Sequence, residues 1–115
     1  MPEPINYDEI VDGLVQKTDE GKIAWSQVYS ENNFSCVLEG GEFTFKVEKR
    51  YDHDADETSL SLTMNDNQGN EIFRVDAPER LALGRKLSNL HESARRQALD
   101  VEQKISAVKN ILKKI

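Results

Sequence analysis

The stretch from Phe34 to Val47, "FSCVLEGGEFTFKV", limits the fold more than any other part of the chain. Apolar and polar residues alternate on both sides of Gly40-Gly41, and a period of two predicts two strands. Adjacent glycines fit a two-residue primed turn, because such a turn needs positive φ at one or both of its positions. The turn aligns three apolar pairs: Leu38 with Phe43, Cys36 with Phe45, and Phe34 with Val47. If Glu39 faces Glu42, all six fall on one face of a hairpin.

A second hairpin follows by the same reasoning. Leu60, Leu62 and Met64 alternate with polar residues, and "DNQG" forms a loop that ends at Gly69. A four-residue loop places Leu62 opposite Phe73 and Leu60 opposite Val75. The other face of these strands is polar, and we expect it to meet water. Its residues are Thr44, Lys46, Glu48, Ser61 and Thr63.

Helix signals stand before these strands. Asn6 and Glu9 form a capping box, Ile5 and Ile10 a hydrophobic staple, and Gly21 fits a left-handed cap. They predict a helix over about residues 7–19, and a strand pattern begins after it. Trp25 alternates in phase with Ile23, and we expect this large ring in the core.

Helical periodicity returns after the strands. Asp76 and Glu79 form a second capping box with Pro78 in the first turn, which predicts a helix start there. The apolar residues that follow, at spacings of three and four, are Leu83, Leu87, Leu90, Ala94, Ala98, Val101, Ile105, Val108, Leu112 and Ile115. Asp100 with Gln103 could cap a new helix, so two helices that meet near Leu99-Asp100 are favoured over one long helix.

The predicted fold is therefore a single α+β domain over residues 1–115. It consists of an N-terminal helix, an antiparallel meander of about five strands, and one or two C-terminal helices that cover one face of the sheet. The segments "KTDEGKIAW" (17–25) and "ARRQALDVEQKI" (94–105) flank the meander. Together these features resemble a pattern in small uncharacterised bacterial proteins over roughly the whole chain. The resemblance implies the same order of elements, and no known activity is attached to it.

Charge is distributed unevenly along the chain. Residues 1–79 carry 18 acidic and 6 basic residues, whereas residues 80–115 carry 9 basic and 3 acidic ones. The two parts could attract each other within one fold, or the basic part could face a polyanion. The first interpretation is favoured.

Cysteine content and the N-terminal sequence bear on location. Cys36 is the only cysteine, so no intramolecular disulfide can form, and a reducing compartment fits best. The first residues form no basic leader, and no apolar run approaches the ~18 residues that a membrane span needs. We expect a cytoplasmic protein.

Candidate catalytic and metal sites are few. Asp52, Asp54 and Asp56 have the spacing that begins a calcium loop, but Glu57 and Thr63 stand where that loop needs glycine and glutamate. Cys36 shares the phase of core residues, and nothing in the sequence joins it to His53 or His91. We therefore expect no catalytic residue, no metal and no cofactor.

The remaining candidate is a basic edge on the C-terminal helices. It consists of Arg85, Lys86, Arg95, Arg96, Lys104 and Lys109. Single-stranded nucleic acids are usually bound with the help of aromatic side chains, and residues 80–115 contain none. A solvated or salt-bridged helix face is therefore favoured for this edge, followed by a surface for a protein partner, with nucleic acid last.

These observations predict a small non-enzymatic protein that acts through protein–protein contacts as an adaptor, regulator or inhibitor-type binder. A homodimer through the C-terminal helices is compatible with this interpretation. The alternatives are a nucleic-acid-associated protein that uses the basic C-terminal helices, and a small-ligand carrier with a pocket between sheet and helices. The stripe through Val101, Ile105, Val108 and Leu112 is expected to be buried, so that truncation after Leu99 would unfold the protein.

Overall fold

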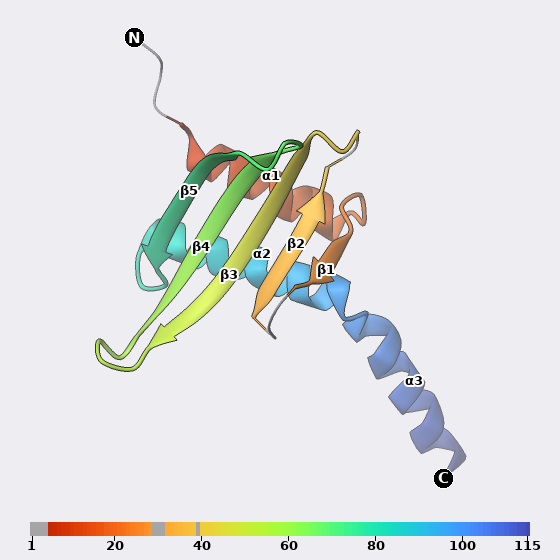
Figure 1. The fold of residues 1–115 in the computed structure, drawn as a ribbon. Helices are drawn as coiled ribbons and strands as arrows, with labels where there is room; N and C mark the ends of the chain where they lie inside the picture. Colours follow the sequence, from red (N-terminus) through yellow and green to blue (C-terminus); the bar gives the residue numbers. More distant parts are fainter. Residues whose placement is uncertain (1–4, 29–31, 39) are drawn as a thin grey trace.

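The computed structural model describes residues 5–28, 32–38 and 40–115. A helix comes first, followed by five strands and two further helices (Figure 1). The elements are α1 Tyr7–Asp19, β1 Trp25–Gln27, β2 Asn33–Val37, β3 Phe43–Asp52, β4 Glu57–Asp66, β5 Glu71–Pro78, α2 Ala82–Ala98 and α3 Val101–Lys114. This order confirms the predicted α+β class and its antiparallel meander.

All five strands belong to one antiparallel sheet in the order β1-β2-β3-β4-β5. Helix α2 packs against every strand, and α1 packs against α2 on the same face (Figure 1). In the part of the chain that the structure describes, no helix lies on the opposite face. The α1, α2 and sheet layers are called the body below.

The predicted start and end of α1 are confirmed. The Asn6 side chain accepts a hydrogen bond from the backbone N–H of Glu9 at 3.1 Å, so it satisfies one free donor of the first turn. At the other end Gly21 has φ +76°, and the N–H of Lys22 donates to the carbonyl of Lys17 at 2.9 Å. This left-handed ending reverses the chain toward β1.

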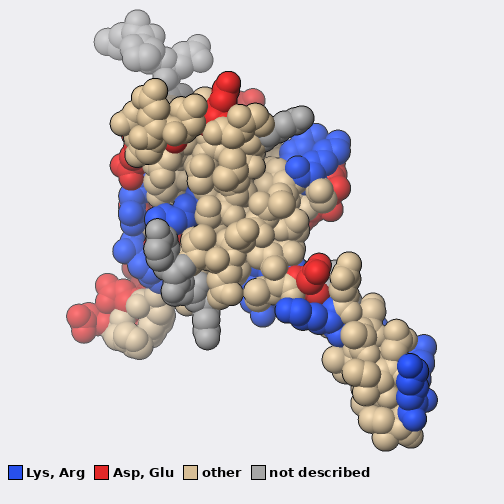
Figure 2. Space-filling model, turned by 45° about the vertical axis from the view of Figure 1, so that its right-hand side comes forward, with Lys and Arg blue, Asp and Glu red and all other residues tan. Residues whose placement is uncertain are grey.

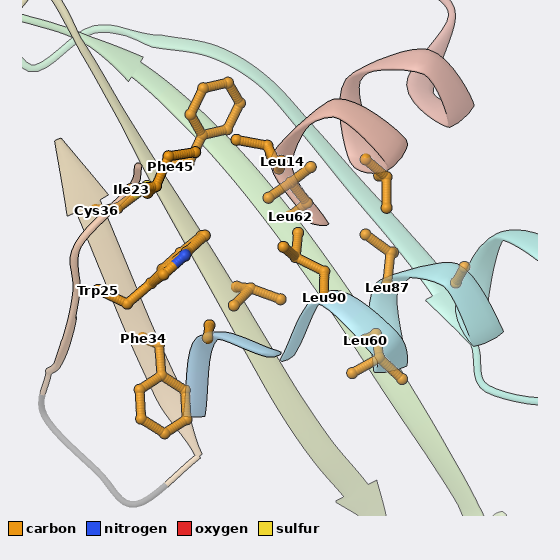
Figure 3. Packing of buried hydrophobic residues seen from close by; sticks show 14 of the residues in the cluster. Leu14, Ile23, Trp25, Phe34, Cys36, Phe45, Leu60, Leu62, Leu87 and Leu90 are labelled. Carbon is orange, nitrogen blue, oxygen red and sulfur yellow. The ribbon is translucent and has the colours of Figure 1, made fainter. Parts of the chain in front are cut away.

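The core lies between the covered face of the sheet and the helices (Figure 3). Trp25 is 4% exposed, which confirms its predicted place in the core. Its indole N–H donates to Thr18 Oγ1 at 2.8 Å, and its backbone N–H donates to Gln97 Oε1 at 2.7 Å. Trp25 therefore links β1 to α1 and to the last turn of α2.

The register of the first hairpin is confirmed. Cys36 faces Phe45, Phe34 faces Val47, and the N–H of Leu38 donates to the carbonyl of Phe43 at 2.9 Å. The expected pairing of Glu39 with Glu42 lies outside the described residues.

The predicted register of the second hairpin is wrong by two residues. Leu62 faces Val75 and Leu60 faces Ala77, while Phe73 faces Met64. Two features cause the shift. Asp66 pairs with Asn70, which leaves only residues 67–69 in the loop, and Ile72 forms a bulge on β5. The apolar residues still share one face, because a shift of two preserves the alternation.

The polar face of the sheet meets water less than expected. Ser61 and Thr63, on the central part of β4, are 1% and 5% exposed. Ser61 lies between Glu48 and Asp76, and Thr63 between Lys46 and Arg74, so longer side chains of the two neighbouring strands flank them. The expectation of solvent exposure is therefore wrong for these two residues.

The predicted start of the second helix is also wrong. Strand β5 continues to Pro78, where Ala77 and Pro78 pair with Leu60 and Ser59, and α2 begins only at Ala82. The N–H of Glu79 donates to the carbonyl of Thr58 at 2.9 Å, so this segment completes the sheet. Pairing with β4 overrides the local capping signal.

The predicted helix break at Leu99-Asp100 is confirmed, although Asp100 does not act as the expected cap. Helix α2 ends at Ala98, and Asp100 has φ +55° and ψ 42° with no side-chain cap hydrogen bond. Aspartate tolerates this left-handed conformation better than most residues do. The chain therefore changes direction at Asp100 and continues as α3.

Candidate interaction surface

Helix α3 projects away from the body (Figure 1). Among the described residues it packs only against the end of α2, and every residue from Gln103 to Ile115 is exposed. The radius of gyration is 16.0 Å, whereas about 13 Å is usual for a compact chain of this length. The prediction that the stripe on this segment is buried is therefore wrong.

The apolar residues of α3 face solvent. Four of them and Ile115, which directly follows α3, are called the α3 stripe below. They are spaced alternately four and three residues apart: Val101, Ile105, Val108, Leu112 and Ile115. Ile105, Val108 and Leu112 are 45%, 54% and 65% exposed, and Ile111 beside them is 57% exposed. Contiguous exposed apolar surface of this kind marks an interaction site in many soluble proteins.

Four lysines lie around the rest of the α3 surface. In Figure 2 the helix projects at the lower right, with lysine side chains gathered along one side of it. Helical geometry puts Lys113 and Lys114 on the side away from the α3 stripe and puts Lys104 and Lys109 next to it. Helix α3 is thus amphipathic without the body covering its apolar side.

The six residues of the predicted basic edge make different contacts. Lys86 pairs with Asp12 at 3.1 Å and with Asp8 at 3.6 Å, so it joins α2 to α1. The hydrogen bond to Asp12 raises the pKa of Lys86. These contacts agree with the interpretation that the acidic and basic parts attract each other within the fold.

The other members of that edge are divided between the two C-terminal helices. Arg95 and Arg96 approach Glu92 at 3.5 and 3.3 Å, and Arg85 donates to the carbonyl of Arg80 at 3.0 Å. Lys104 and Lys109 lie on α3, away from the body. Binding of a partner by these six residues stays a prediction.

The exposure of the α3 stripe is the feature that the sequence did not predict correctly. Its spacing of four and three was visible in the sequence, and this regular seven-residue period is typical of a helix that pairs with another helix. The same residues were interpreted as core because a stripe does not reveal what covers it.

The junction between α2 and α3 is held at the body. Gln97, two residues before the junction, accepts the hydrogen bond from the backbone of Trp25. The N–H of Leu99 completes the last turn of α2 by donating to the carbonyl of Arg95 at 3.0 Å. These two hydrogen bonds fix the end of α2, from which α3 continues.

Cys36 is 2% exposed, which confirms its predicted burial. Burial raises the pKa of the Cys36 thiol to about 12, and the thiolate is the reactive form. We expect native protein at neutral pH to react with a thiol reagent far more slowly than urea-unfolded protein does. Rapid labelling of folded protein would contradict the burial of this side chain.

His91 is the other buried group that could titrate. It is 4% exposed, its Nε2 lies 2.9 Å from the carbonyl oxygen of Asn32, and its ring packs edge-on against Phe34. Burial lowers the pKa of His91, and the positive charges of Lys49 and Arg95 act in the same direction. These contacts give His91 a structural role between α2 and β2.

The lowered pKa of His91 predicts loss of stability in acid. Unfolded histidine has a pKa of about 6.5, and the folded value is lower. As pH falls below 6.5 the unfolded state therefore takes up the proton first, and the free energy of unfolding decreases. We expect the difference in unfolding free energy between wild type and His91→Gln to shrink from pH 8 to pH 5 in urea titrations. A constant difference would contradict this assignment.

The acidic loop is organised by its own backbone. Asp52 accepts hydrogen bonds from the N–H groups of Asp54 and Ala55 at 3.0 and 3.3 Å, and the Tyr51 hydroxyl donates to Asp56. His53 packs edge-on against Tyr51 in the same loop. No group of three or more potential metal ligands is found among the residues that the structure describes.

No protein family model, no curated protein and no solved structure matches this chain. Within residues 5–28, 32–38 and 40–115, no helix is both long enough and apolar enough to span a bilayer.

Proposed function

We propose that this chain is a small non-enzymatic protein that acts by binding another protein chain through the α3 stripe. The observation that carries the proposal is the exposure of this stripe, with Val108 54% and Leu112 65% exposed on a helix that the body does not cover. An apolar helix face of this kind is a common docking element between proteins.

The chemistry of the body supports a binding role. The Cys36 thiol is buried and protonated at neutral pH, and His91 is engaged with the backbone of Asn32. Trp25 and Phe45 are each 4% exposed and pack in the core, so neither is available to line an open ligand pocket. Nucleic-acid binding receives less support, because Lys86 is engaged with two aspartates of α1.

Truncation after Leu99 is expected to leave the body folded. The removed segment packs only against the end of α2, so its loss should change the unfolding free energy by less than about 1 kcal/mol. Circular dichroism with thermal melting of residues 1–99 beside the full chain tests this. Loss of a cooperative transition would show that α3 supports the body.

The binding role is tested by crosslinking and affinity capture with the full chain and two variants. Val108→Asp places a charge in the α3 stripe, whereas Asn110→Asp places the same charge on the opposite side of the helix. We expect every specific protein contact to be lost with Val108→Asp and kept with Asn110→Asp. Contacts that survive Val108→Asp would contradict the proposed surface.

A further inference from the structure

The spacing of the α3 stripe points to another helix as its cover. Val101, Ile105, Val108, Leu112 and Ile115 follow the alternating steps of four and three that define the contact line of a coiled coil. Helices that pack on a globular core usually carry a broader apolar face with a period nearer 3.6. The stripe therefore matches a single helix that lies alongside α3.

Helix α3 needs such a cover. It has 14 residues, and isolated helices shorter than about 12 to 15 residues are marginal in water. Its neighbour among the described elements is α2, which it meets at the junction alone. A second helix would supply the packing that the body does not provide.

The residues of α3 favour a helical partner over a lipid surface. Ile105, Val108 and Leu112 are aliphatic and recur at the spacing of a coiled-coil contact line. Helices that lie on membranes usually insert tryptophan or phenylalanine as well as leucine, and α3 has one leucine and no aromatic residue.

We propose that α3 pairs with α3 of a second copy of this chain, in antiparallel orientation, with Ile105 facing the partner's Val108. This proposal rests on the proposed function and identifies the binding partner as a second copy of the chain. A two-fold axis then repeats each contact, so one stripe covers an identical one. Val101 faces the partner's Leu112 in the same register.

The lysines beside the stripe select the orientation. In a parallel pair, helical geometry places Lys104 next to the partner's Lys109, and like charges at these flanking positions repel. In the antiparallel pair Lys104 lies next to the partner's Ile111, which its aliphatic stem can cover. Ile111 is 57% exposed in the single chain, so this contact buries a further apolar residue.

The predicted contact is short, and self-association should therefore be weak. Four layers of side chains over a 14-residue helix form a smaller interface than the roughly 1,200 to 2,000 Å² of stable complexes. We expect a monomer–dimer equilibrium in the micromolar range, with helicity that increases with concentration.

Sedimentation equilibrium of the full chain over a hundredfold concentration range tests the pairing. The expected result is a reversible rise from the monomer mass of 13.1 kDa toward twice that value. Val108→Asp should weaken this association at least tenfold, and the matched Asn110→Asp should leave it unchanged. A mass that stays monomeric throughout, or that continues to rise beyond a dimer, overturns the proposal.

The orientation is tested by the distance between spin labels at Lys114→Cys, in a Cys36→Ser background. The antiparallel register separates the two labelled positions by on the order of 20 Å along the axis, whereas a parallel pair places them side by side. A short distance overturns the antiparallel arrangement.

These results separate the two proposals. If the chain stays monomeric but captures a different protein, and Val108→Asp abolishes this capture, pairing with a second copy is wrong and the proposed function remains supported. A monomeric chain whose captured proteins survive Val108→Asp overturns both.

Discussion

Replacing Gly84 with alanine is expected to destabilise the protein by about 3 kcal/mol or more. A Cβ at this position would lie 1.8 Å from the carbonyl oxygen of Pro78 and 2.9 Å from the Cα of Glu79. Both are backbone atoms, at the last residue of β5 and the residue after it, so relief requires the first turn of α2 to move away from the sheet. Since ordinary domains are stable by about 5 to 15 kcal/mol, this is a large part of the total.

Gly13 provides the matched control. It lies inside α1, and a Cβ there would meet no atom within 4 Å. Gly13→Ala should therefore stabilise the protein by about 0.5 to 1 kcal/mol, because alanine favours the helix. Urea unfolding of both variants measures the two effects. A Gly84→Ala protein within 1 kcal/mol of wild type would contradict the close approach of α2 to β5.

Trp25→Ala is the second change with a large expected effect, a loss of about 3 to 5 kcal/mol. The side chain is 4% exposed, and its removal leaves a cavity at the point where β1, α1 and α2 meet. It also removes the indole donor of the 2.8 Å hydrogen bond to Thr18.

Two further variants help to interpret the Trp25→Ala result: one isolates the lost N–H donor, and the other is a control at an exposed residue. Trp25→Phe keeps most of the buried ring but loses the N–H donor, and we expect a loss of about 1 to 2 kcal/mol. Val37→Ala, at a residue that is 59% exposed on the same sheet, should cost less than about 1 kcal/mol. Thermal and urea unfolding provide the comparison. Equal losses for Val37→Ala and Trp25→Ala would contradict the core position of Trp25.

Sequence patterns correctly predicted the features that depend on residues close together in the chain, such as turns and helix ends. Gly40-Gly41 determines the register of the first hairpin, in which Cys36 faces Phe45. Asn6 caps α1 as its capping box indicated, and the second helix ends near Leu99. In each case the interaction joins residues close in sequence, so the pattern contains the information.

Features that depend on distant partners were not predictable in the same way. The capping box of Asp76 and Glu79 is overridden because Ala77 pairs with Leu60, seventeen positions earlier in the chain. Ser61 is buried through long side chains on neighbouring strands. A polar or capping residue does not reveal which strands will flank it.

The candidate site shows the same limit most clearly. The sequence displays the α3 stripe, but an apolar stripe has the same appearance whether it faces a sheet or another protein. The chain turns at Asp100, which has φ +55°, and α3 leaves the body beyond this residue. Whether the stripe can contact a partner depends on this direction of α3.

The outer strands of the sheet restrict how copies of this chain can assemble. Strand β1 has three residues, and β5 is interrupted by the bulge at Ile72 and ends at Pro78, which has no N–H to donate. Neither edge offers a long, regular row of hydrogen-bonding groups to a sixth strand. The sheet is thus protected against edge-to-edge extension, and growth into β-linked fibres is disfavoured at both of its sides.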